Sequence, residues 1–527
     1  MLEAMDINKA MQTALECLRT GNVVRAERTY EEILRIQPGN VNALHFLGVA
    51  YYRNKKYKPA IMCMKRVLQL RPDYADAHNN LGIILKDIGQ LHEAMSCFRK
   101  AVALKPAFFE AYVNLGGILR SQGSLDEAIA CFQKAVQLNP LFYGTYNDLG
   151  IMLKDKMRFD EAVICFQTAL GLNPRFLESY INLGNTLQAK GLIDEAVACF
   201  QKAVQLCPDS AYAHYNLSLA LLQSGNFREG WEKYERRRDI EGLSYLRTHF
   251  SQPLWDGSDM RGGAVLLLGE QGFGDIIQFV RYAPFVTQRN ARLILCCHKE
   301  LKSLMQNVDG IQEVVTYGEQ LPEFAAYCPL LSLPFIFRSL IENIPTNIPY
   351  IRVDTSLSPQ WEETIQSGSS RLKAGLVWSG NPDNASLLYK SCLLQTFSPL
   401  AELDDVTFYS LQKGAAAAQA KNPPRGMNLI DYTEEINDFA DTAALIQHLD
   451  LVISVDTAVA HLAGALGKPV WTLLPYPPDW RWMLNREDSP WYPSMRLFRQ
   501  CSPGDWEPVI AHIGTELRKL LILCGSR

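Results

Sequence analysis

A repeat of 34 residues runs through the first two-fifths of this 527-residue chain. Each copy places an alanine, then an aromatic residue or methionine, then a proline at fixed distances after a glycine. The clearest copies are Gly48, Ala60, Met64, Pro72; Gly82, Ala94, Phe98, Pro106; Gly116, Ala128, Phe132, Pro140; Gly150, Ala162, Phe166, Pro174; and Gly184, Ala196, Phe200, Pro208. A helix–turn–helix unit of this length cannot bury its apolar face alone, so it must stack on its neighbours. The sequence therefore predicts an α-solenoid.

This spacing is that of the tetratricopeptide repeat. About six copies and a degenerate last copy fill residues 1–240, and the last copy loses the pattern at Gly230-Trp231. A charged stretch, Glu235–Asp239, follows it. We expect this stretch to cap the end of the stack.

A polar column recurs two residues before the glycine of successive copies. Its members are Asn80, Asn114, Asp148, Asn182 and Asn216. First helices line the concave face of such a solenoid, so the column is expected to follow a groove. An asparagine amide donates and accepts hydrogen bonds at once, which suits the backbone of a bound peptide. The same side chains can instead brace neighbouring helices, and both interpretations stay open.

The thirteen cysteines do not indicate disulfides or a metal site. Five of them recur at the repeat pitch, namely Cys63, Cys97, Cys131, Cys165 and Cys199. Packed helices lie about 8–10 Å apart, which exceeds the roughly 7 Å Cα limit for a disulfide. Elsewhere the cysteines and histidines lack the spacing of metal ligands. We therefore expect no metal and no resident cofactor.

Composition argues against several classes of function. The chain is 48% hydrophobic and 20% charged with a net charge of −4, which gives no electrostatic case for nucleic acid or an anionic membrane surface. It contains no apolar run of 18 residues, so no membrane span is expected. Its start, MLEAMDINKAMQ, lacks the basic and apolar segments of a signal peptide. A cytoplasmic protein is the expectation.

After residue 240 the pattern changes to short apolar runs separated by helical segments. The strand-like runs are 264–268, 293–295, 372–377, 406–409, 451–454 and 470–474. This alternation predicts parallel sheets with helices on both faces. It falls in two blocks, about 262–355 and 370–507, with a closing helix at 506–523. For residues 241–527 we therefore predict two facing doubly wound lobes with the site between them.

The first candidate motif directly follows the first predicted strand, at Gly269–Asp275. Its glycines, which include Gly272 and Gly274, run in the order GxxGxG, which differs from the dinucleotide-binding fingerprint. A carboxylate at such a strand-to-helix turn can act as a general base. Asp275 can equally serve the turn alone by capping the helix.

A second candidate motif lies where another predicted strand gives way to a helix. Asp456 and Thr457 stand at this junction, and His461 lies one turn further on. The backbone N–H groups at a helix start form an anion site that suits a diphosphate. His461 can donate to the phosphate or the sugar, or it can serve the core alone. The nearby Gly467-Lys468-Pro469 lacks the spacing of a P-loop, which argues against ATP hydrolysis.

A third candidate motif runs from a strand through Gly380 and Asn381 to Lys390. It places small and basic groups at the opening of the second lobe, facing the cleft.

Together these motifs resemble the heptosyltransferase-like glycosyltransferases (family 9, GT-B fold), and more closely the bacterial proteins in which repeats precede this domain. The resemblance covers most of residues 252–510. The matching stretches include Glu270–Gly272, Gly274-Asp275, Asp438–Ile446, Asp450–Leu474, Asp479–Trp482 and Pro490–Pro493. It implies a nucleotide-sugar co-substrate and inverting transfer without a metal ion.

The same resemblance implies roles for the candidate residues. Asp275 would deprotonate the acceptor. The donor's diphosphate and sugar would be held by Asp456, Thr457 and His461, with Gly272, Gly274, Gly380, Asn381 and Lys390 completing the donor site.

The repeats resemble those of the O-linked N-acetylglucosamine transferases, in which a similar asparagine ladder holds the protein acceptor. This implies a protein or peptide partner in the groove. One stretch, Asp383–Ser391, departs from the family 9 pattern of a His/Asp/Arg-rich loop ending in Arg-Ser. Lys390 replaces an arginine there, as a point charge instead of a bidentate fork. Three hypotheses follow: a transferase acting on proteins, a non-catalytic scaffold with a degenerate nucleotide-sugar site, and transfer to a lipid or polysaccharide.

Overall fold

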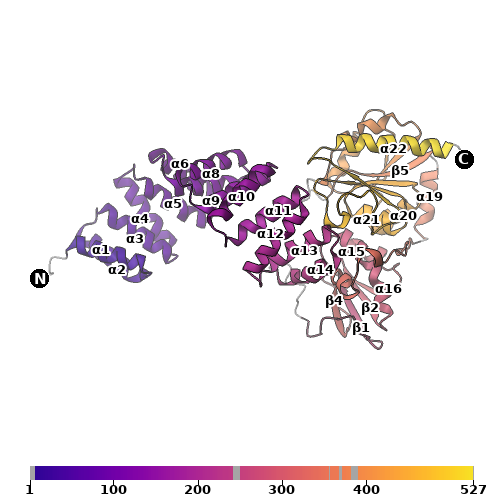
Figure 1. Cartoon of the computed structure of the whole chain (residues 1–527), viewed down its shortest axis with the longest axis horizontal. Helices are drawn as coiled ribbons and strands as arrows, with labels where there is room; N and C mark the ends of the chain where they lie inside the picture. Colours follow the sequence, from indigo (N-terminus) through magenta and orange to yellow (C-terminus); the bar gives the residue numbers. More distant parts are fainter. Residues whose placement is uncertain (1–5, 241–249, 355, 367–370, 381–389, 526–527) are drawn as a thin grey trace. The chain divides into compact units, whose positions relative to one another are not determined.

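The computed structural model describes residues 6–240, 250–354, 356–366, 371–380 and 390–525. The chain forms two compact units, one ending at Thr186 and the other beginning at Leu187 (Figure 1). The predicted fold class is confirmed, because helical repeats precede a region of two parallel sheets with helices around them. The division at 186/187 lies upstream of the repeat boundary predicted near residue 240.

The repeats are pairs of antiparallel helices. Their bounds are α1 Ile7–Arg19, α2 Val23–Ile36, α3 Val41–Arg53, α4 Tyr57–Leu70, α5 Ala75–Asp87, α6 Leu91–Leu104, α7 Phe109–Ser121, α8 Leu125–Leu138, α9 Tyr143–Asp155, α10 Phe159–Leu172, α11 Leu177–Ala189, α12 Ile193–Leu206, α13 Ala211–Gln223 and α14 Phe227–Tyr234. A Cβ on Gly82 would lie 2.7 Å from the ring of Phe98. Gly48, Gly116 and Gly150 show similarly close approaches, so the glycine lets the two helices of these repeats pack closely. The five repeated cysteines are free thiols.

The first lobe is a four-stranded parallel sheet in the order β3-β2-β1-β4. Its strands are β1 Ala264–Leu268, β2 Arg292–Cys297, β3 Ile311–Thr316 and β4 Ala326–Pro329. Strand order reverses between β1 and β4. In open parallel sheets this is where ligands bind.

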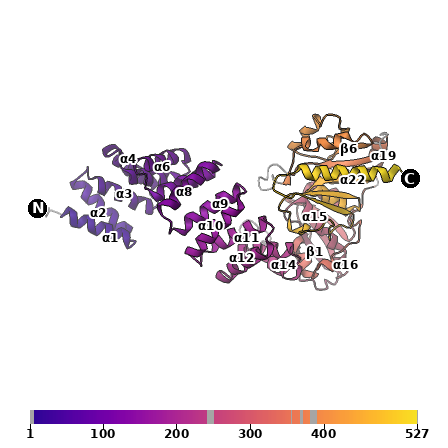
Figure 2. The ribbon, with the colours of Figure 1, turned by 45° about the horizontal axis from the view of Figure 1, so that its top comes forward.

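The second lobe is a six-stranded parallel sheet in the order β10-β9-β8-β5-β6-β7. Its strands are β5 Leu372–Val377, β6 Val406–Ser410, β7 Leu429–Asp431, β8 Leu451–Val455, β9 Val470–Leu474 and β10 Met495–Arg499. Here the order reverses between β5 and β8, where Val377 pairs with Ser454. The closing helix α22 (Glu507–Gly525) lies along this sheet in both views (Figures 1 and 2).

Two short helices bring the lobes together. Helix α15 (Phe273–Phe279) follows β1, and α21 (Ala458–Ala465) follows β8. A Cβ on Gly274 in α15 would lie 2.8 Å from Cδ2 of His461 in α21. The two candidate motifs therefore meet across the boundary between the lobes.

The last repeat belongs to the second unit and shares its core. Phe227, Trp231 and Tyr234 of α14 lie in the same buried apolar cluster as the strands of both lobes. The following 3₁₀ helix, η1 (Glu235–Asp239), does not cap a free end as expected. Its Arg237 side chain is completely buried against the first lobe, because it pairs there with a buried carboxylate. Among the described residues, no helix has the length and apolarity needed to cross a membrane.

Candidate functional site

The Gly269–Asp275 turn follows the carboxyl end of β1 and leads into α15. Gly272 is the N-cap residue of α15, and its N–H donates to Oδ2 of Asp275 at 2.8 Å. Asp275 is therefore not the N-cap residue that the alternative interpretation expected; it lies three residues later and accepts from the N–H of the N-cap residue. Its side chain is 17% exposed. Burial raises the pKa of Asp275 above its ordinary value, although Arg481 and the Gly272 N–H act in the opposite direction.

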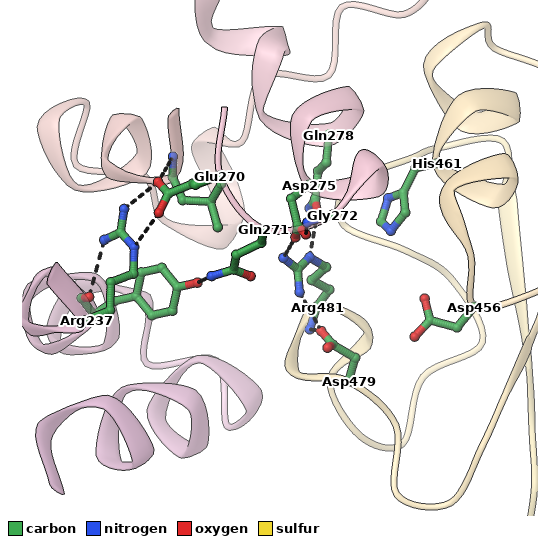
Figure 3. A network of polar contacts seen from close by, with 12 residues as sticks. Arg237, Glu270, Gln271, Gly272, Asp275, Gln278, Asp456, His461, Asp479 and Arg481 are labelled. Carbon is green, nitrogen blue, oxygen red and sulfur yellow. Dashed lines mark hydrogen bonds and ion pairs between the residues drawn. The ribbon is translucent and has the colours of Figure 1, made fainter. Parts of the chain in front are cut away.

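Arg481 of the second lobe connects the Gly269–Asp275 turn of the first lobe to Asp479 of the second lobe (Figure 3). Its guanidinium contacts Oδ1 of Asp275, donates from Nε to Gln278 at 2.7 Å, and donates from Nη1 to Asp479 at 2.9 Å. Burial alone would lower the pKa of Arg481, but the two aspartates outweigh it and raise that pKa. Arg481 therefore stays positively charged between two carboxylates.

In the second lobe, Asp479 and Asp456 both lie near the ammonium group of Lys390. Nζ of Lys390 lies 2.7 Å from Oδ2 of Asp456 and 3.9 Å from Oδ2 of Asp479. Burial would raise the pKa of Asp479, but Arg481 and Lys390 together lower it to about 2. Asp479 is therefore ionised at neutral pH, and Lys390 lies near the carboxyl groups of both Asp456 and Asp479.

His461 is buried beside the Gly269–Asp275 turn, with 5% of the residue exposed. Its Nδ1 lies 2.9 Å from the Tyr492 hydroxyl, and its ring stacks on Trp482 at 5.3 Å between centroids. Burial lowers the pKa of His461 to about 3, against the opposing effect of Asp456. The imidazole is therefore neutral at physiological pH and can take part only through hydrogen bonds.

The remaining predicted donor-site residues lie at the carboxyl ends of β5 and β8. Thr457 is the N-cap of α21, and its hydroxyl lies 3.0 Å from Oγ of Ser454 instead of capping the helix. The N–H of Gly380 donates to Ser391 at 3.0 Å. Asn381, and all of the altered loop before Lys390, fall outside the described residues.

Three members of the polar column make contacts between adjacent first helices. Asn80 lies 2.8 Å from the His45 ring, Asn114 donates to Asn79 at 3.3 Å, and Asn182 donates to Asn147 at 3.0 Å. In the second unit, Asn216 donates to the carbonyl of Tyr212 within its own helix. Burial raises the pKa of Asp148, and Arg120 opposes this shift. All five side chains are half-buried. These are the contacts that bracing requires, and peptide capture stays a prediction.

Arg481, Asp479 and Gln278 had no assigned role in the sequence interpretation. Asp479 and Arg481 lie in a stretch that carries the family resemblance, so their position was marked but their function was not. Arg481 meets Asp275 across 206 residues of sequence. A contact between chain segments so far apart leaves no local pattern.

Comparison with known proteins agrees with this architecture. Profiles described as TPR repeat or tetratricopeptide repeat match residues 50–89, 75–108, 109–142, 143–176 and 188–225. The profile described as glycosyltransferase family 9 (heptosyltransferase) matches residues 436–500. Repeats of this type and a C-terminal region of family 9 type are therefore both present in this chain. The second match covers β8 and α21 and supports glycosyltransferase activity in general.

The chain is also similar to a curated protein and to solved structures. Protein FlbA of Caulobacter vibrioides is 27% identical over 320 residues, which cover 56% of this chain and 53% of FlbA. The chain thus spans about half the length of this relative. The crystal structure of MamA is 28% identical and matches 31% of this chain and 96% of MamA, with a TM-score of 0.30. PilF of Pseudomonas aeruginosa is 20% identical and matches 39% of this chain and 94% of PilF, with a TM-score of 0.37.

Proposed function

We propose that this chain transfers a sugar from a nucleotide-activated donor to a protein held by its repeats. The observation that carries the proposal is a chain of ionic contacts across the boundary between the two parallel-sheet lobes. Asp275 contacts Arg481, Arg481 pairs with Asp479, and Lys390 lies near both Asp479 and Asp456. Asp275 and Asp456 each lie shortly after a strand that borders a reversal of strand order, where such sheets bind ligands.

Asp275 is the proposed general base. Its raised pKa makes it a better proton acceptor than an exposed aspartate. It takes the proton of an acceptor hydroxyl as that oxygen attacks the anomeric carbon of the donor. The bond from this carbon to the phosphate oxygen breaks, and the nucleoside diphosphate leaves with the electron pair. Displacement from the opposite face inverts the anomeric centre.

The donor diphosphate is proposed to bind at the start of α21. The Thr457 side chain does not cap this helix, so its first N–H groups can point to a phosphate. Lys390 can exchange its contact with Asp456 for one with the phosphate, and Asp456 then becomes available to a sugar hydroxyl. In this proposal Lys390 and Arg481 supply the positive charge, and no metal ion is required.

The repeats are proposed to present the acceptor, since tetratricopeptide repeats are protein-binding modules. The test is co-expression of the full chain with candidate acceptor proteins, followed by intact-mass measurement. Asp275→Asn should lower transfer by about 10²–10⁴-fold, the usual contribution of a general base. Asp309→Asn, an exposed carboxylate of the same lobe paired with Arg352, is the matched control and should keep full transfer.

The outcomes separate the three hypotheses. A sugar mass on a protein that is lost in Asp275→Asn supports the proposal. Labelled sugar in the lipid or polysaccharide fraction alone identifies a different acceptor class. No transfer from any donor by the folded full chain contradicts catalysis and favours the scaffold.

A further inference from the structure

We infer that the last repeat, together with the 3₁₀ helix η1 that follows it, positions the Gly269–Asp275 turn. Arg237 and Tyr234 are the positioning residues. The inference rests on the proposed function in that Asp275 is taken as the base. It adds that the repeat module contributes structure to the transferase site itself, beyond any binding of an acceptor.

Arg237 holds the turn through Glu270, the residue two places before Gly272 (Figure 3). Its Nε and Nη2 donate to the two carboxylate oxygens of Glu270 at 3.0 and 2.6 Å. Both side chains are 0% exposed. Oε1 of Glu270 also accepts from the N–H of Leu331, just after β4. This one ion pair therefore joins the last repeat to the carboxyl ends of β1 and β4.

The next residue in the turn is held by the same repeat. Nε2 of Gln271 donates to the hydroxyl of Tyr234 at 2.8 Å. Gln271 has a φ of +61°, in the left-handed region that side chains other than glycine rarely adopt. A conformation of this kind persists where surrounding contacts hold it. Tyr234 supplies such a contact three residues before Arg237.

The repeat also contacts the loop that carries Arg481. The ring of Trp231 lies 5.3 Å from that of Trp480 in an edge-to-face arrangement. Nε2 of Gln223 in α13 donates to the carbonyl of Pro478 at 3.2 Å. The repeat thus holds one loop from each lobe, and these two loops meet where Arg481 contacts Asp275.

A positioning role explains why the contact between Arg237 and Glu270 is ionic. A buried ion pair usually gives no more stability than apolar residues of the same volume, but it demands one geometry. Because both carboxylate oxygens of Glu270 are bound, the pair fixes the distance and the orientation of Glu270 relative to Arg237. The turn that follows it, from Gln271 to Asp275, begins from that fixed point.

The test measures hydrogen exchange and the pH dependence of transfer in the full chain. The variants are Arg237→Lys and Tyr234→Phe. Their matched controls are Arg236→Lys, on the same 3₁₀ helix and 40% exposed, and Tyr212→Phe, which is 60% exposed. Tyr234→Phe removes one hydroxyl from the repeat, so it decides the question even if Arg237→Lys does not fold.

In Arg237→Lys, we expect amides of residues 269–279 to exchange about tenfold faster, since a charge-assisted bidentate contact is lost. In Tyr234→Phe, we expect the same amides to exchange roughly fivefold faster, because one neutral hydrogen bond is lost. Exchange in α3–α10 should not change. The acidic limb of the kcat profile should move to higher pH in both variants, because a looser turn weakens the Asp275–Arg481 contact that lowers the pKa of Asp275.

Unchanged exchange at 269–279 in folded Tyr234→Phe would overturn the inference, as would faster exchange spread evenly over the second unit. An unmoved pH limb with lower kcat would show a purely structural role and also overturn it. Failure of the proposed function appears separately, as absence of transfer by the wild-type chain, and the exchange result still decides whether the repeat holds the turn.

Discussion

At Gly274 the two lobes approach each other closely, and Gly274→Ala tests that contact. A Cβ there would lie 2.8 Å from Cδ2 of His461, closer than the 3.0 Å below which real Cβ contacts essentially never occur. His461 has little freedom to move, because it stacks on Trp482 and bonds to Tyr492. Either α15 or the imidazole must shift.

The expected change in the stability of Gly274→Ala follows from two opposing effects. Alanine normally stabilises a helix by about 0.5–1 kcal/mol relative to glycine. Overpacking a filled site costs about 1–3 kcal/mol. The net expectation for Gly274→Ala is a loss of up to about 2 kcal/mol in the free energy of unfolding. Because a shift of about 1 Å in a reacting group can cost roughly 10²-fold in rate, transfer should fall by about that factor.

The assay is chemical denaturation of the full chain together with the transfer rate. Gly117→Ala is the matched control, because this helical glycine in α7 has no atom within 4 Å of an added Cβ. That variant should be more stable than the wild type by about 0.5–1 kcal/mol and fully active. If Gly274→Ala were equally stabilised and equally active, the close approach of the two motifs would be refuted.

Three further predictions concern the buried charges. Arg237→Met should lower the free energy of unfolding by about 3–5 kcal/mol, because it leaves Glu270 buried and unpaired. The double variant with Glu270→Met should recover part of that loss. If the two substitutions lower the denaturation midpoint additively, this prediction is contradicted. Arg481→Gln should move the acidic limb of the transfer profile to higher pH, because it removes the positive charge that lowers the pKa of the base. An unmoved limb argues against Asp275 as that base. His461 has a folded pKa of about 3, below its ordinary 6.5, so stability should be constant above pH 6.5 and fall by about 2 kcal/mol by pH 5. In His461→Gln this acid-dependent loss should disappear, and an unchanged pH dependence of unfolding would refute the assignment.

Most of the fold could be predicted from periodicity. The 34-residue repeat marked the paired helices, and six strand-like runs became β1, β2, β5, β6, β8 and β9. The four strands that were missed carry weak local signals. In β3, Gln312 and Glu313 interrupt the apolar residues, β4 is four residues long and ends at Pro329, and β7 has three residues. In β10, Arg496 and Arg499 interrupt the apolar residues, so no continuous apolar run marks it.

The site was predictable only in part, and the reason is physical. Asp275, Asp456 and His461 each follow a strand, so local pattern alone marked them as candidates. The partners Arg481 and Arg237 act through contacts that form only when distant segments pack together. Arg237 even lies in a charged stretch that resembles solvent-exposed sequence, yet it is completely buried because Glu270 neutralises it.

The central claim, a nucleotide-sugar site between the lobes, is tested most directly by thermal-shift binding of nucleoside diphosphates and their sugars to the full chain. A ligand at 100 times its Kd stabilises the folded state by about 2.7 kcal/mol, which is readily measured. We predict a shift selective for one nucleotide and reduced in Lys390→Ala, because Lys390 lies at the start of the proposed diphosphate site. If no nucleotide shifts the unfolding of the folded wild-type chain, the claim is contradicted and the chain is a scaffold.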